Sequence, residues 1–97
     1  MIRHVVMWKL PEDEDKQANA QKIKEQLEEL TDTIGEIKHL EVGINIKESD
    51  AAYDVVLISD FDNENDLQIY AGHPKHQEVA DFIGSVVSER VVVDYQK

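Results

Sequence analysis

The segment YDVVLISDFDNENDLQIYAGHPKHQEVADFI, residues 53–83, decides the fold because it predicts a strand followed by an interrupted helix. Its first part, 53–61, is apolar on both sides in its middle, which is typical of a strand with both faces covered. Alternation of side chains places Asp60 on the face of Val56 and Ile58. We expect its carboxylate at a strand end near solvent.

The second part of this segment predicts two short helices rather than one. Asn63 is a good capping residue with Asp66 three positions on, so a helix is expected to start there. Gly72 can end that helix. Pro74 suits the first position of the next helix, with His73 before it as the cap. The helix is therefore predicted to break near Gly72–Pro74.

The remaining sequence predicts one further helix and three further strands. Residues 13–33 are polar with a helical apolar stripe, and Gly35 is expected to stop this helix. The stripe consists of Ile23, Leu27, Leu30 and Ile34. Residues 2–10 and 90–95 are β-rich, and residues 37–46 alternate as a strand with one apolar face. The short link from 46 to 53 predicts a hairpin.

The predicted order is β–α–β–β–α–β, which is the α+β pattern of a ferredoxin-like protomer. Right-handed connections place both helices on the same face of the sheet. Strands 2–10 and 53–61 are apolar on both sides, so the other sheet face also needs cover. We infer a homodimer in which two sheets pack face to face.

Length and charge narrow the class of protein. The 97 residues fit a single domain, residues 1–97. The net charge is −11 without any Lys/Arg cluster, so we expect no nucleic-acid or membrane partner.

There are no cysteines, which excludes a disulfide scaffold and thiol catalysis. No apolar run approaches the roughly 20 residues that cross a bilayer. We expect a cytoplasmic protein.

Four ordered stretches carry a family resemblance: HVVMWKL at 4–10, GEIKHLEVGINI at 35–46, the segment 53–83, and RVVVDY at 90–95. The most specific element is a tyrosine, two residues, HP, one residue, H and a spaced F. Together these stretches resemble the stress-responsive dimeric A/B barrel (Dabb) family. The resemblance implies a ferredoxin-like protomer and a homodimer whose sheets form an α/β barrel.

The resemblance also implies candidate site residues. Plant polyketide cyclases with this domain use a tyrosine and a histidine on the broken helix for an aldol cyclisation. Tyr70 and His76 match these by position in the motif, and His4 matches a histidine on the cyclases' first strand. Val55 stands where the cyclases place another polar pocket residue.

The histidine chemistry allows several interpretations. His73 and His76 lack a third ligand and the spacing of a helical zinc motif, so we predict neither a metal site nor a cofactor. His73 is interpreted as a helix cap. His76 either bonds a backbone carbonyl or Tyr70, or acts as a base beside a carbonyl whose oxygen Tyr70 holds. His4 is either a satisfied core histidine or a pocket residue.

Three functional hypotheses follow. The first is a stress-associated homodimer that binds a small apolar carbonyl or aromatic compound through His4, Tyr70 and His76. The second is a polyketide cyclase- or isomerase-type enzyme with His76 as base and Tyr70 orienting the oxygen. The third is a purely structural or interaction protein in which the motif only shapes the helix break. An enclosed cavity of a few hundred Å³ under Tyr70 and His76 would separate the first two from the third.

Overall fold

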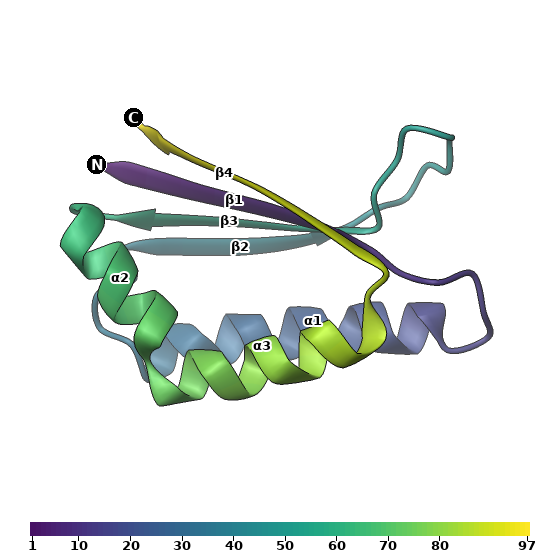
Figure 1. The fold of residues 1–97 in the computed structure, drawn as a ribbon, viewed down its shortest axis with the longest axis horizontal. Coiled ribbons are helices and arrows are strands. Elements are labelled where there is room, and N and C mark those ends of the chain that lie inside the picture. Colours follow the sequence, from purple (N-terminus) through teal and green to yellow (C-terminus); the bar gives the residue numbers. More distant parts are fainter.

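The computed structural model describes residues 1–97 and has the predicted β–α–β–β–α–β order, with the second helix divided in two (Figure 1). Its elements are β1 (Ile2–Lys9), α1 (Lys16–Glu29), the 3₁₀ turn η1 (Leu30–Asp32), β2 (His39–Ile44), β3 (Val55–Phe61), α2 (Glu64–Gly72), α3 (Pro74–Val86) and β4 (Glu89–Gln96). No helix has the length and apolar character needed to cross a membrane.

The first helix ends earlier, and by another device, than the sequence predicted. α1 stops at Glu29 and tightens into η1, where the amides of Thr33 and Ile34 both donate to the Leu30 carbonyl. No glycine has a positive φ, so Gly35 does not end the helix in a left-handed conformation. The 3₁₀ turn satisfies the terminal carbonyl instead.

The strands form one antiparallel sheet in the order β2-β3-β1-β4. The predicted hairpin of β2 and β3 is confirmed, with Val42 opposite Leu57. β1 is central, because Val6 faces Leu57 on one side and Val92 on the other. The N- and C-terminal strands therefore lie side by side (Figure 1).

All helices cover the same face of the sheet, as right-handed connections require (Figure 1). The predicted stripe of the first helix is buried in full and packs against this inner face. Alternate residues of β1 and β3 meet it, and α3 adds Val79 and Ile83. One hydrophobic core thus joins the sheet to the helices.

The predicted helix break is confirmed at its caps. The Asn63 side chain accepts a hydrogen bond from the Asp66 amide at 2.8 Å, which starts α2. The His73 Nδ1 atom accepts one from the Lys75 amide at 3.1 Å, which starts α3, with Pro74 in its first turn. His73 is therefore a capping residue at the junction between α2 and α3.

The opposite face of the sheet, called the outer face below, carries exposed apolar side chains. β1 and β4 place there four large side chains that are 39–62% exposed: Met7, Val91, Val93 and Tyr95. Val5 lies opposite Val93, and Val56 and Ile58 extend the same face onto β3; all three are half-buried. The outer face is thus an apolar surface without cover from the helices.

The expectation for Asp60 was wrong. Asp60 is only 3% exposed, although it lies on the outer face. Arg3 faces it across the β1–β3 pair, and its Nε and Nη2 atoms donate to the two carboxylate oxygens at 2.8 and 2.9 Å. Lys97 adds a contact at 3.4 Å. These cations hold the pKa of Asp60 at about 2.

Candidate functional site

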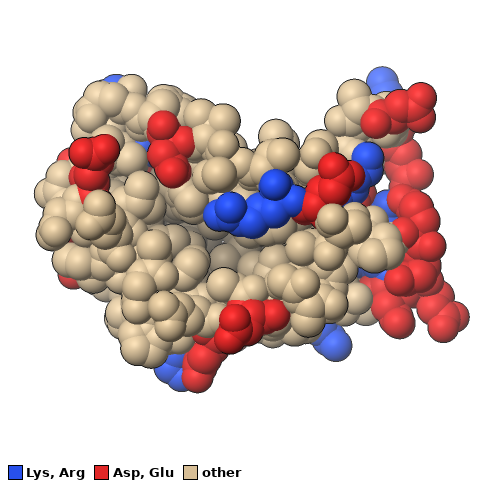
Figure 2. Space-filling view, viewed as in Figure 1, with Lys and Arg blue, Asp and Glu red and all other residues tan.

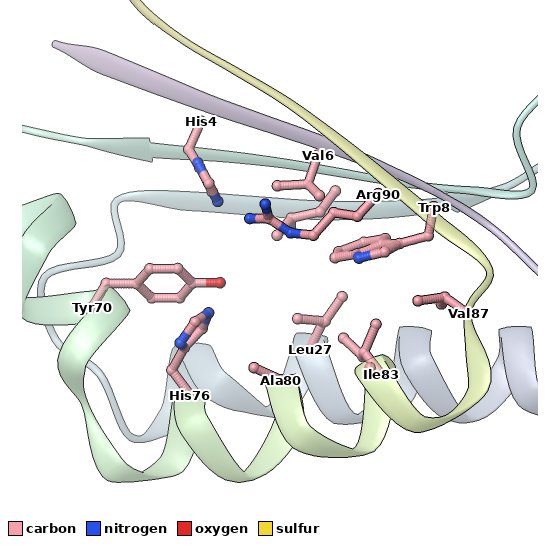
Figure 3. Close-up of a pocket in the computed structure, with 12 residues that line it drawn as sticks. His4, Val6, Trp8, Leu27, Tyr70, His76, Ala80, Ile83, Val87 and Arg90 are labelled. Atoms are coloured by element: carbon pink, nitrogen blue, oxygen red, sulfur yellow. The ribbon is translucent and has the colours of Figure 1, made fainter.

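A cavity of about 260 Å³ lies between the inner face of the sheet and helices α2 and α3 (Figure 3). Its wall is mostly apolar, and its polar groups come from both termini and from the broken helix. The lining residues are His4, Val6, Trp8, Leu27, Leu57, Tyr70, His76, Ala80, Ile83, Gly84, Val87 and Arg90. The structure therefore brings His4, Tyr70 and His76, from two distant parts of the chain, to a single cavity.

Tyr70 reaches the cavity from the last turn of α2. Tyr70 is only 1% exposed, and its ring packs against the ring of Phe61 with 5.0 Å between the centroids. Its hydroxyl group nevertheless has no hydrogen-bond partner in the chain and points into the cavity (Figure 3). Burial raises the pKa of the Tyr70 hydroxyl, so this group stays protonated. It is a donor available to a ligand oxygen.

His76 lies beside Tyr70, with 4.4 Å between the ring centroids. Its Nδ1 atom is 3.1 Å from the backbone carbonyl oxygen of Ala71. A carbonyl only accepts, so this contact requires the proton on Nδ1 and leaves the Nε2 lone pair free. Burial is the main cause that lowers the pKa of His76, which keeps the ring neutral at pH 7. The structure thus has the backbone contact that one interpretation of His76 expected, and the role of a base stays a prediction.

His4 enters from β1 on the opposite wall and is 8% exposed. Its Nδ1 atom forms a short contact with the Asp94 carboxylate of the neighbouring strand β4. This contact orients the ring, with its edge toward Tyr70 and 6.1 Å between the ring centroids. A histidine held in this way presents its other nitrogen in a defined direction.

Two polar residues of this site, Asp94 and Arg90, were not predicted from the sequence. Arg90 lies opposite Trp8 in the β1–β4 pair, and its guanidinium group extends over the cavity (Figure 3). Alternation along RVVVDY does place Arg90 and Asp94 on the same side of the strand. Only the pairing of β4 with β1 shows that this side faces the cavity.

The other two histidines and Val55 lie away from the cavity. His73 caps α3, and His39 is exposed on the outer face of β2. Val55 is buried in the core and does not line the cavity. No three His, Cys, Asp or Glu side chains are grouped so that they could hold a metal ion. The polar chemistry of the cavity therefore rests on His4, Tyr70, His76 and Arg90.

The surface charge is distributed unevenly around the cavity. Figure 2 shows a hollow in the middle of the viewed face, with basic atoms beside it. Acidic side chains gather at the end of the molecule that holds the β1–α1 connection and the β2–β3 loop (Figures 1 and 2). On this face the densest group of acidic side chains thus lies at that end, although single acidic side chains also lie near the hollow.

This arrangement defines an α+β protein of ferredoxin-like fold with a small cavity between its sheet and its broken helix. The chain belongs to the Stress Responsive A/B Barrel Domain (Dabb) family, whose model matches residues 2–97. A search of curated proteins gave no match.

Several solved structures have a fold similar to that of this chain. The chain is 32% identical to a dimeric protein of unknown function with a ferredoxin-like fold from Bacteroides fragilis, at a TM-score of 0.90, covering 99% of this chain and 95% of that one. A Dabb family protein from Mesorhizobium loti is 21% identical, with a TM-score of 0.80 and coverage of 99% and 95%. A hydroxynitrile lyase from Passiflora edulis is 18% identical, with a TM-score of 0.83 and coverage of 97% and 90%. The last two are similar in fold.

Proposed function

We propose that this protein binds a small, largely apolar carbonyl or aromatic compound in the cavity. The observation that carries the proposal is the buried Tyr70 hydroxyl, which faces the cavity and has no partner. An unpartnered buried polar group costs about 1–3 kcal/mol, and a ligand carbonyl oxygen would remove that cost. Apolar walls with few converging polar groups are typical of small-molecule sites.

The geometry supports one orientation of such a ligand. Its oxygen would accept from Tyr70, between the rings of His4 and His76. Its apolar part would lie along Val6, Trp8 and Ile83. A volume of about 260 Å³ suits a compound with one aromatic ring better than a large cofactor.

Trp8 provides the test, because it is the only tryptophan and lines the cavity. We expect 4-phenylbutan-2-one, a neutral aromatic ketone, to change Trp8 fluorescence until the binding site is saturated. Tyr70→Phe should weaken this binding about tenfold, as for one lost buried hydrogen bond. Tyr53→Phe is the matched control, since the Tyr53 hydroxyl contacts Glu89 rather than the cavity. Saturation that is unaffected by Tyr70→Phe would contradict this site.

A second candidate is an enzyme of cyclase or isomerase type, and the protonation state of His76 favours it. The neutral ring with a free Nε2 lone pair is the form that a general base requires. In the proposed step, Nε2 takes a proton from the carbon beside the carbonyl. The electron pair of that C–H bond forms a carbon–carbon double bond, and the π pair of the carbonyl moves to the oxygen. The Tyr70 hydroxyl donates to the resulting enolate oxygen. The fold alone assigns no reaction.

Proton exchange separates this enzyme from a binding protein. In D₂O, an active base would exchange the α-protons of 4-phenylbutan-2-one or a β-polyketone analogue, which NMR detects directly. His76→Ala should abolish the protein-dependent exchange. His73→Asn is the control, since asparagine retains a helix cap while the imidazole is lost. Binding without exchange removes the enzyme hypothesis, and absence of binding leaves the structural hypothesis.

We also propose that the protein is a homodimer joined through its outer faces. The exposed apolar residues of β1 and β4 support this, and several similar structures are described as dimeric. Burying such a surface against a second copy is favourable at about 25 cal/mol per Å² of apolar area. The cytoplasmic location expected from the sequence stays a prediction, which cell fractionation tests.

A further inference from the structure

Arg90 is a cation that the chain itself leaves without a counterion. The protein has two arginines, and the other one, Arg3, forms an ion pair with Asp60. Arg90 takes part in no ion pair within the chain. Lys9, Lys22 and Lys47 also form no ion pair, so Arg90 is distinguished by its position at the cavity. Arg90 is an exposed residue, and its guanidinium group lies over the cavity (Figure 3).

The nearest acid on the same side of β4 is already engaged. Asp94 contacts Nδ1 of His4, so its charge is directed to that ring. No other carboxylate lines the cavity. The cavity therefore combines one unpaired guanidinium group, one unpartnered hydroxyl donor and two histidines, with no free anion to balance them.

We infer that the ligand of this cavity is an ionised compound, an apolar molecule with a carboxylate group that Arg90 binds beside the Tyr70 hydroxyl. The inference rests on the proposed function, because it requires the cavity to be the binding site. A carboxylate accepts two parallel hydrogen bonds from a guanidinium group, and its second oxygen can also accept from a hydroxyl. The apolar part of the molecule would then extend toward Trp8 and Ile83.

The charge of Arg90 is felt at both neighbouring groups. Burial is the main cause that lowers the pKa of His76, and the charge of Arg90 adds a smaller effect in the same direction. The same charge opposes the effect of burial on the pKa of Tyr70. A bound carboxylate would offset the positive charge and raise the pKa of His76. Binding of an anion is therefore expected to be accompanied by proton uptake near neutral pH, whereas binding of a neutral ketone is not.

A matched pair of probes tests the inference. 3-Phenylpropanoate and 4-phenylbutan-2-one have nearly the same shape, since a carboxylate oxygen in the first replaces the terminal methyl group of the second. We expect Trp8 fluorescence to report about tenfold tighter binding of the carboxylate. Arg90→Gln should remove that preference while binding of the ketone persists. Arg90→Lys should retain part of it, because the charge remains but the planar fork is lost.

Lys22→Gln is the control, because it removes one positive charge from an exposed position of α1 that does not line the cavity. It should leave the preference unchanged. Equal binding of the two probes, or a preference unaltered by Arg90→Gln, would overturn the inference and leave the proposed function standing. If neither probe changes Trp8 fluorescence or the NMR signals of His76, both the inference and the proposed function fail.

Discussion

The ring of His76 packs against the ring of Tyr70 with 4.4 Å between centroids, while its Nδ1 atom contacts the Ala71 carbonyl. The Ala71 carbonyl at the end of α2 thus sets the tautomer of His76 at the start of α3, and the Tyr70 ring packs against the His76 ring. The break is therefore a structural element and also orients two candidate functional groups.

Removing the Tyr70 hydroxyl should not weaken the fold. The Oη atom is buried and has no partner, so Tyr70→Phe loses no internal hydrogen bond. We expect the free energy of unfolding to stay equal or to rise by about 1 kcal/mol, as desolvation of the orphan group is no longer required. Urea unfolding with the Tyr53→Phe control measures this. A loss greater than 1 kcal/mol would show that the hydroxyl has a partner in solution.

His76 should titrate below its ordinary pKa of 6.5. The folded value is lower than the unfolded one, so protonation favours the unfolded chain. The stability contribution of neutral His76 is complete above pH 6.5 and is lost as the pH falls through the folded value. Ring-resonance NMR over pH 4–8 gives the midpoint directly. A midpoint above 6.5 in the ligand-free protein would contradict the burial of this ring.

Asp60→Asn should destabilise the protein at pH 7. The amide replaces a carboxylate that accepts two hydrogen bonds from Arg3 and one from Lys97. We expect a loss of about 1.5–3 kcal/mol, the range for hydrogen bonds to a charged group. The folded pKa is about 2 against an ordinary 3.8, so the stabilisation holds above pH 3.8 and disappears toward pH 2.

The pH dependence distinguishes this ion pair from a general packing defect. The difference in unfolding free energy between wild type and Asp60→Asn should shrink as the pH falls from 4 to 2. Asp62→Asn is the control, because Asp62 is exposed and contacts Lys38 only at 3.6 Å. A difference that stays constant over this range would mean that the charge of Asp60 does not matter.

A charge on the outer face should separate the proposed dimer. Val93 is 62% exposed on that face, and Val93→Glu would place a carboxylate between two apolar sheets. Sedimentation of the wild type should show about 22 kDa, twice the 11.1 kDa of one chain, and the variant should show the single chain. Val92→Glu is the matched control, because Val92 is next to Val93 in the sequence but its side chain points to the inner face. An 11 kDa wild type at micromolar concentration would refute the dimer.

Local patterns were sufficient to predict most of the fold. The helical stripe of the first helix, the hairpin and the caps at Asn63 and His73 all depend on residues close in sequence, and the structure has each of them. The end of the first helix was misplaced, because a 3₁₀ turn satisfied the terminal groups where a glycine was expected to do so. Such alternatives differ little in energy, which makes boundaries the least predictable feature.

The burial of Asp60 and the position of Arg90 could not be predicted in the same way. Alternation gives two faces for every strand, but it does not say what lies across from each residue. Asp60 is buried only because Arg3 is its partner on β1, more than fifty residues away in the chain.

The family resemblance pointed to the three residues that were expected to meet, whereas the sequence by itself determined the order of elements and the broken helix. Their local causes are apolar periodicity and capping, which act over a few residues. Only the tertiary structure decided that a cavity lies beneath Tyr70, that Asp94 orients His4 and that Arg90 lies over the opening. Those relations arise when β1 and β4, the two ends of the chain, pair in one register, because strand register sets which distant side chains share a face.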